Sequence, residues 1–343
     1  MSSMLVNAEF SERIVKAFQL LPAYAHLTGI PDNKVQSFAE TLLDLSNVSG
    51  NGSLGISSLN GDQAPMQLCI KSASDGISFR LIADPASDDS VHNRRYLRAK
   101  SALINTLELT QTCGLRPIAE ELLAIFGPHN PQHADKFTHG VFWLAASVDA
   151  PGAAIYVDTS VYSDEEVWSR ILQWFSSYTP EGSEKAICSI DTFRPYCRIS
   201  SVGIEGLDRD RTRVKFYMRI FKDMPDSLLG NLFPPISELG KSGCFRVIME
   251  DTGLSPGDVL FNIGIHAKNG ELVNAKIDIS GSSLGMGSDK ADQIVNDCCK
   301  ALNLPGISLS RLMKDYNLEI SFLSVGINLD MEKNINVYLK GGS

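Results

Sequence analysis

The sequence has no surplus of basic residues. Its 343 residues include 31 Lys and Arg against 40 Asp and Glu, which gives a formal net charge of −9 at pH 7 and a sequence pI of about 5.2. A protein that holds nucleic acid needs a broad face with an excess of Lys and Arg to neutralise phosphates. We therefore expect no nucleic acid partner, although a local group of cations can still bind a small anion.

Long apolar runs and paired cysteines are also missing. No apolar run approaches the ~20 residues of a membrane span, and the first residues, MSSMLVNAEFSER, lack the basic and apolar regions of a signal peptide. Seven cysteines, an odd number without paired spacing, favour free thiols over a disulfide framework. These absences predict a cytoplasmic protein without a membrane partner.

Pairs of strand-like segments recur along the whole chain. In each pair, two segments with the two-residue alternation of a strand flank a short turn signal such as Asn269-Gly270. The five pairs occupy 66–72 and 77–83, 137–148 and 153–158, 196–204 and 213–220, 258–266 and 271–280, and 318–329 and 334–340. Segments with helical apolar spacing lie before and between them, including 10–27, 32–45, 91–112, 118–126, 289–302 and 309–315. The pattern indicates a repeat of roughly 55–75 residues.

Ten antiparallel strands need a closed arrangement. An open sheet would leave two unpaired edges, and helices between hairpins can cover only one of its faces. A barrel with helices outside and a lumen inside satisfies both constraints. We therefore predict an α+β fold in which residues 1–343 form a single ten-stranded antiparallel β-barrel ringed by α-helices, built from five hairpin-plus-helices repeats. The polar residues of each strand must then face the lumen.

The predicted lumen contains cations and phenols. In the segment 211–220, RTRVKFYMRI, apolar residues alternate with cations and a tyrosine. The same parity on every strand places polar side chains in the lumen, among them Arg80, Tyr156, Asp158, Arg213, Lys215, Tyr217, Arg219, Asn262, His266, Lys276, Asp278, Asn334, Asn336, Tyr338 and Lys340. Lys and Arg bind diphosphate, and aromatic faces stabilise a carbocation, so this set suits allylic group transfer. Alternatively, the row is the salt-bridged wall of a non-catalytic barrel that binds an amphipathic ligand.

Several of these residues lie in segments that resemble a known family. Arg213-Val-Lys215-Phe-Tyr217 is similar to the Arg-x-Lys-x-Tyr strand of the ABBA-type aromatic prenyltransferases, the group that includes the dimethylallyltryptophan synthases and the cyanobactin prenyltransferases. Further similar segments follow in order: Pro65-Met-Gln67, Phe79-Arg80, Ile155-Tyr156, Lys276-Ile-Asp278 and Asn336-Val-Tyr338-Leu-Lys340.

The resemblance implies a barrel fold and a reaction. The reaction is transfer of a dimethylallyl or longer prenyl group from an allylic diphosphate to an electron-rich acceptor. The resemblance also implies that four cations bind the diphosphate and that three tyrosines shield the allylic cation; the cations are Arg80, Arg213, Lys215 and Lys276, and the tyrosines are Tyr156, Tyr217 and Tyr338.

The chain departs from the family at the acceptor side. Gln67 lies where indole-specific members have a Glu that accepts the indole N–H, Ala154 replaces a lysine, and Asp278 replaces a shielding tyrosine. An indole, free or within a peptide, is the first acceptor that we expect, with a phenol or another peptide side chain as the alternative. Because an amide lacks the charge of a carboxylate, we expect free tryptophan to be a poor acceptor and Gln67→Glu to favour it.

Two further groups bear on the chemistry. His139 lies near a strand end, where a neutral imidazole can accept a proton near pH 7; a purely structural histidine is the alternative. Asp158 and Asp278 could bring a Mg²⁺ ion to the diphosphate, or they could form salt bridges with the lumen cations. No cofactor is expected to be obligatory.

Overall fold

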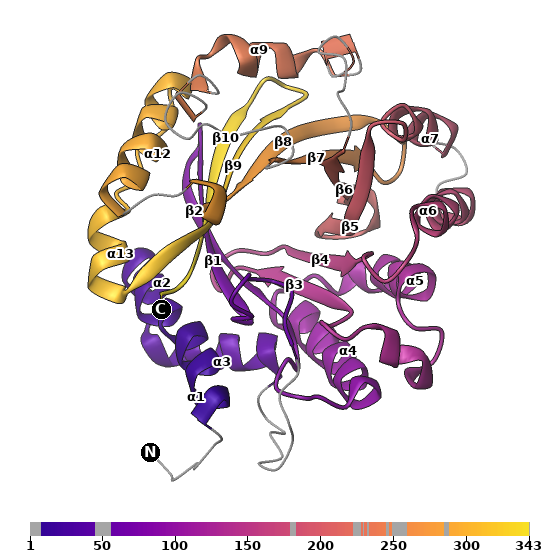
Figure 1. Ribbon diagram of the computed structural model, residues 1–343, viewed down its shortest axis with the longest axis horizontal. Coiled ribbons are helices and arrows are strands. Elements are labelled where there is room, and N and C mark those ends of the chain that lie inside the picture. The colour runs from indigo at the N-terminus through magenta and orange to yellow at the C-terminus, as the bar shows by residue number, and fades with distance from the viewer. Residues whose placement is uncertain are drawn as a thin grey trace.

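Ten strands close into one antiparallel barrel with helices around its outside (Figure 1). The computed structural model describes residues 8–44, 56–178, 183–221, 228, 230–231, 233–244, 247–248, 259–284 and 288–342. Around the barrel the strands follow the order β1-β10-β9-β8-β7-β6-β5-β4-β3-β2, so every spatial neighbour except the β1 and β10 pair is also a neighbour in sequence. The predicted ten-stranded barrel ringed by helices is therefore confirmed.

The strands form five hairpins at the predicted places. They are β1 (Met66–Ala73) with β2 (Gly76–Ala83), β3 (Phe142–Ala146) with β4 (Ala153–Asp158), β5 (Cys197–Gly206) with β6 (Arg213–Ile220), β7 (Val259–His266) with β8 (Leu272–Ser280), and β9 (Leu318–Asn328) with β10 (Lys333–Gly341). The five hairpin turns lie at one end of the barrel, which we name the lower end. The even-numbered strands run from there to the upper end.

The helices precede the barrel or connect its hairpins. Before β1 come α1 (Ala8–Phe18), α2 (Leu20–Thr28) and α3 (Asp32–Leu43). Between hairpins lie α4 (His92–Leu109), α5 (Arg116–Phe126), α6 (Asp164–Tyr178), α7 (Ser183–Asp191), α9 (Pro235–Lys241), α11 (Gly281–Leu284), α12 (Ser288–Leu302) and α13 (Ser310–Tyr316), with short 3₁₀ turns at Cys113–Leu115 and Pro131–Lys136. A further 3₁₀ turn, Arg209–Arg211, lies within the β5–β6 hairpin.

The hydrophobic core fills the ring between barrel and helices. On β6, Val214, Phe216 and Met218 are fully buried on the outward face, and the Phe216 ring lies 6.0 Å from that of Phe175 on α6. Burying one such side chain stabilises the fold by about 1.5–3 kcal/mol, so the outward-facing apolar side chains of the strands hold the helices in place. The polar side chains, which alternate with the apolar ones along each strand, face the other way and line the lumen.

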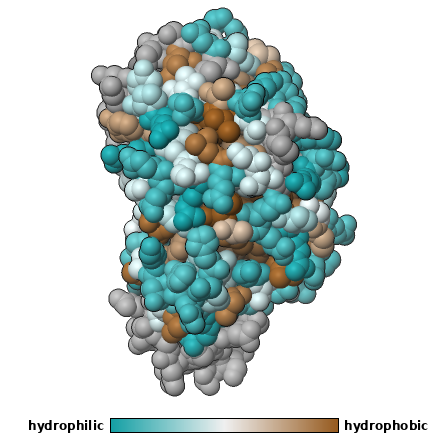
Figure 2. Space-filling model, turned by 90° about the vertical axis from the view of Figure 1, so that its right-hand side faces the viewer, coloured by the Kyte–Doolittle hydropathy of each residue, from teal (hydrophilic) through white to brown (hydrophobic). Residues whose placement is uncertain are grey.

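The outer faces of the helices are mostly polar. On the side of α6 and α7, hydrophilic residues predominate and apolar areas are small and scattered (Figure 2). A capping box is present at the start of α6, where Ser163 and Glu166 exchange backbone and side-chain hydrogen bonds. In the described part of the chain, no helix is both long and apolar enough to span a membrane.

Two predicted element boundaries were wrong, and one helix was missed. The helix expected over 10–27 divides at Gln19 into α1 and α2, because Pro22 has no N–H to donate to Phe18. The strand expected from residue 137 begins only at Phe142, because a 3₁₀ turn ends at Lys136 and Gly140 adopts a φ of 98°. Helix α7 was not predicted.

Candidate active site

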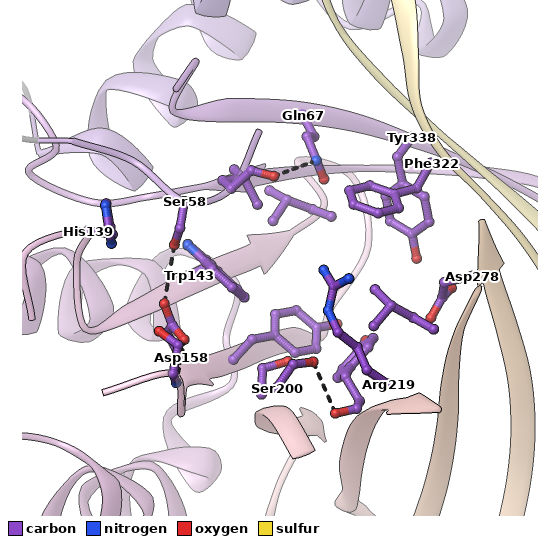
Figure 3. A pocket seen from close by; sticks show the side chains of 17 residues that line it. Ser58, Gln67, His139, Trp143, Asp158, Ser200, Arg219, Asp278, Phe322 and Tyr338 are labelled. Atoms are coloured by element: carbon purple, nitrogen blue, oxygen red, sulfur yellow. Dashed lines mark hydrogen bonds between the residues drawn. The ribbon is translucent and has the colours of Figure 1, made fainter. Parts of the chain in front are cut away.

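Among the described residues, two cavities lie within the barrel, one toward each end. The upper cavity, of about 370 Å³, is lined by Gln67, Trp143, Tyr156, Tyr217 and Tyr338 together with Asp158, Arg219, Asp278 and Phe322 (Figure 3). The lower cavity, of about 500 Å³, is lined by Arg80, Glu205, Arg213 and His266 and by the hairpin turns around Pro151 and Arg211. The aromatic and cationic groups predicted for one lumen are thus arranged along the barrel axis.

The three predicted shield tyrosines line the upper cavity. Tyr156 and Tyr217 meet edge to face, with ring centroids 5.7 Å apart and an interplanar angle of 84°. Tyr338 makes a similar contact with Phe322, at 6.4 Å and 90°. Burial raises the pKa of all three phenols, so they remain neutral at physiological pH. Together they present uncharged aromatic surface to the middle of the lumen.

A glycine makes room for one of these rings. On β5, Gly203 pairs with Tyr156 of β4, and a Cβ atom at residue 203 would lie 2.4 Å from Tyr156 Cδ1. A distance this short is a steric overlap, so the tyrosine ring can take its position only because residue 203 has no side chain.

Below the tyrosines, three of the four predicted diphosphate ligands surround one carboxylate. Glu205 Oε1 is 3.0 Å from Arg80 Nη1 and 3.1 Å from Arg213 Nη2, and Glu205 Oε2 forms a close ion pair with Lys215 Nζ. Lys215 Nζ also lies 5.9 Å from the centroid of the Tyr156 ring, so the cationic group directly adjoins the aromatic layer.

The electrostatics of this group follow from burial and mutual attraction. Burial opposes ionisation of Glu205, but Arg213, Arg80 and Lys215 outweigh it and hold its pKa well below that of an ordinary glutamate. Burial lowers the pKa of Lys215 to about 8, against the attraction of Glu205. The carboxylate is therefore charged at every physiological pH, whereas the charge on Lys215 changes just above neutrality.

The fourth predicted ligand, Lys276, is buried beside Asp278. Burial, followed by repulsion from Lys215 and Arg213, lowers the pKa of Lys276 well below its ordinary value. Burial raises the pKa of Asp278, although Ser324 and Lys276 oppose the shift. An anion entering the lumen would favour the charged form of Lys276, because it would replace part of the solvation that burial removed.

Some lumen oxygen atoms have no hydrogen-bond partner. Within the described part of the chain, Asn262 Oδ1, Asn334 Oδ1 and Asp278 Oδ2 are buried without one. Buried polar atoms in folded proteins are rarely left without a partner from the protein, a ligand or water. Their position inside the barrel therefore marks the lumen as a place built for a polar ligand or solvent.

The side chain of Gln67 is held in one orientation. Its Nε2, which has two N–H groups to donate, lies within hydrogen-bond distance of Leu59 O, Asn60 Oδ1 and Ser321 Oγ, at 3.1, 2.9 and 3.0 Å. Asn60 is fixed in turn, because its Nδ2 donates to the backbone oxygens of Ala64 and Met66. With three acceptors around the nitrogen, the carbonyl oxygen of Gln67 is the atom left to face a ligand in the upper cavity (Figure 3).

His139 and Asp158 lie at the rim of the upper cavity. His139 is exposed in the turn before β3 and lies on the opposite side of the cavity from Tyr338 (Figure 3). Asp158 accepts hydrogen bonds from Ser58 Oγ and the Ser160 N–H. In the described ranges, no group of three or more His, Cys, Asp and Glu side chains is arranged to hold a metal ion.

Four residues that shape the site were not predicted. Glu205 faces the lumen from β5, where the other inward-facing residues include Ser201 and Gly203. Because these residues are small, the alternation of polar and apolar side chains that marks an inward face is weak on this strand. Asn60 lies in an irregular segment that no period describes. Trp143 and Ser321 do lie on strands. Inward parity on β3 could have identified Trp143, whereas Ser321 lies at a register shift between β9 and β10, where parity fails.

Comparison with known proteins identifies the fold. No family model matches the chain, and no curated protein matches its sequence. Solved structures do match: 5-dimethylallyltryptophan synthase from Streptomyces coelicolor (TM-score 0.72, 13 % identity, covering 94 % of this chain and 95 % of that one) and AnaPT from Neosartorya fischeri (0.74, 11 %, 98 % and 96 %).

A third match is 6-dimethylallyltryptophan synthase from Micromonospora olivasterospora in complex with DMASPP and Trp, with a TM-score of 0.67 and 12 % identity over 96 % of each chain. Identities this low establish a shared architecture over nearly the whole chain and not a shared substrate. The resemblance seen in the sequence is thus confirmed for the fold: this chain has the barrel of the dimethylallyltryptophan synthases.

Proposed function

We propose that this protein transfers a dimethylallyl or longer prenyl group from an allylic diphosphate to an electron-rich acceptor, with an indole as the first candidate. The observation that carries the proposal is the order of groups along the lumen: cations toward the lower end, neutral tyrosines in the middle, and the Gln67 carbonyl toward the upper end. Solved structures of the same fold contain product diphosphate, or DMASPP with Trp.

The lower group would bind the donor. Ionisation breaks the bond between the allylic carbon and the diphosphate oxygen and leaves both electrons on the diphosphate. Arg80, Arg213 and Lys215 converge on one point and can stabilise that charge by charge-assisted hydrogen bonds. Lys276, buried nearby in the lumen, would add a fourth cation once the anion is bound.

The tyrosine layer would hold the allylic cation. The faces of Tyr156, Tyr217 and Tyr338 stabilise positive charge and keep water from it, and as neutral phenols they are weak nucleophiles. A carbon of the acceptor ring attacks the cation, a C–C bond forms, and the ring regains aromaticity by losing a proton. His139, at the rim of the upper cavity, is our candidate to accept that proton.

The upper cavity would hold the acceptor. Its aromatic lining suits a flat ring, and the fixed Gln67 carbonyl can accept a hydrogen bond from an indole N–H. We propose no obligatory metal. The whole chain, residues 1–343, would act as one prenyltransferase domain in the cytoplasm, a reducing compartment that suits its seven free cysteines.

Direct assay of transfer tests the proposal. Dimethylallyl diphosphate should be incubated with the protein and a panel of indoles, phenols and cyclic peptides, and the products analysed by mass spectrometry. We expect an indole to gain one dimethylallyl group. Diphosphate binding without transfer to any acceptor would instead support the barrel as a binding protein.

A substitution in the lumen tests whether its cations bind the donor. Arg213→Ala removes charge-assisted hydrogen bonds, worth about 1.5–3 kcal/mol, and should weaken donor binding at least about tenfold with little change in melting temperature. Arg311→Ala, which removes an exposed arginine on α13, is the matched control and should leave both unchanged. Loss of the fold in Arg213→Ala, with normal specific activity in the folded fraction, would show that the cation is structural.

A further inference from the structure

Glu205 forms ion pairs with three of the four cations assigned to the diphosphate. Its oxygens contact Arg80, Arg213 and Lys215, each through a nitrogen that the proposed mechanism needs for the donor. The residue lies on the inward parity of β5, opposite Arg213 on β6 and Ala154 on β4. Its side chain is only 14 % exposed, so the contacts are protected from solvent.

These contacts preorganise the cations and also occupy them. Without a carboxylate, the buried Lys215 and the half-buried Arg80 and Arg213 would repel one another, and Glu205 offsets that repulsion in the free protein. A diphosphate group needs the same N–H donors, and it would bring its own negative charges next to an ionised carboxylate. The anion can therefore bind fully only if Glu205 gives up its partners.

We propose that Glu205 is an internal counter-ion of the diphosphate site, which competes with diphosphate for Arg80, Arg213 and Lys215 and so keeps its affinity low. The inference rests on the proposed function and adds a specific role to it. The expected benefit is rapid loss of the product: once the allylic group has been transferred, Glu205 is beside the cations and can take them back from the inorganic diphosphate.

Calorimetric titration with inorganic diphosphate in EDTA tests the competition. Glu205→Gln keeps the size of the side chain but removes its charge, and it should bind diphosphate at least about tenfold more tightly, as expected when a like charge beside the anion is removed. The matched control is Glu319→Gln, which removes the same charge near Lys340 at the upper end of the barrel and should leave the affinity unchanged.

A second variant covers the case in which Glu205→Gln does not fold. Glu205→Asp keeps the charge but withdraws the carboxylate by one methylene, which weakens its contacts with the three cations. It should bind diphosphate more tightly than the wild type. In steady-state assays, variants that fold should show a lower KM for the donor and stronger inhibition by diphosphate.

The outcomes separate this inference from the function on which it rests. If neither the wild type nor Glu205→Gln binds diphosphate, both the function and the inference are wrong. If the wild type binds and a folded Glu205→Gln binds no more tightly, only the counter-ion role is wrong. The titration should also be repeated with Mg²⁺ in place of EDTA. If Glu205→Gln binds diphosphate more weakly than the wild type only when Mg²⁺ is present, Glu205 is a metal ligand and the proposal is wrong.

Discussion

The environment of Gln67 changes what a substitution there should do. From the sequence, Gln67→Glu was expected to favour free tryptophan by restoring a carboxylate. In the structure, the nitrogen of Gln67 lies within hydrogen-bond distance of Leu59 O, Asn60 Oδ1 and Ser321 Oγ, and a glutamate would place an oxygen against the first two, which can only accept. Acceptors facing acceptors in a buried site are unfavourable.

We therefore predict that Gln67→Glu costs about 1–3 kcal/mol of stability and lowers transfer to every indole, including tryptophan. Denaturant unfolding and kcat/KM for tryptophan and an indole peptide measure the two effects. Gln132→Glu, at an exposed residue, is the control and should change neither. A variant that is as stable as the wild type and gains activity with tryptophan would show that the original expectation was right.

Lys215 gives the proposed reaction a basic pH limit. Its pKa of about 8 means that the free protein loses this cation as the pH rises through about 8. Because kcat/KM reports the ionisation of the free enzyme, we predict that kcat/KM for the donor falls above that pH, with the acceptor saturating. Arginine stays charged, so Lys215→Arg should move the decline to higher pH. An identical decline in both proteins would assign it to another group.

At the scale of elements, the contact between β4 and β5 positions the tyrosine layer. A Cβ atom added at Gly203 would overlap the Tyr156 ring. We predict that Gly203→Ala displaces the ring, lowers kcat at least about tenfold and costs about 1–3 kcal/mol of stability. Gly240→Ala on α9 is the control, because a Cβ there meets nothing within 4 Å. Normal kcat in Gly203→Ala would mean that the position of Tyr156 is not critical.

The strands could be predicted from the sequence because each combines two strong signals. Turn residues such as Asn269-Gly270 mark the hairpins, and the alternation on strands such as β6 follows from one face packing against helices and the other facing polar groups. Helix boundaries were less certain. The apolar spacing runs unbroken across Gln19, and only the missing N–H of Pro22 divides α1 from α2.

From the sequence, the alternation of side chains along a strand predicted which residues of the candidate site face the lumen, but not which residues they contact. Parity identified the lumen residues of β6, but it cannot show that Glu205 binds Arg213 and Lys215, since that depends on the register between strands. It also says nothing of Asn60, which is brought to Gln67 by an irregular segment. Pairwise contacts between distant residues required the structure.

For the whole molecule, the two cavities imply two routes for ligands. Exposed residues border both: His139 and Arg219 at the upper cavity, Ser78 and Arg211 at the lower one. We predict that an acceptor bound in the upper cavity leaves the exchange of diphosphate unhindered. Stopped-flow measurement of diphosphate dissociation, with and without saturating indole, tests this. A rate that falls sharply with indole would indicate one shared route.

The seam between β1 and β10 has a consequence for how the protein is made. Every other pair of strands is joined by a turn or by one helical connection, whereas these two come from opposite ends of the sequence. The ribosome adds about 5–20 residues per second, so the incomplete barrel must exist for some seconds as an open sheet with unpaired edge strands. The nascent chain is therefore most prone to aggregate, and most accessible to chaperones, in the interval before β10 emerges and closes the barrel by pairing with β1.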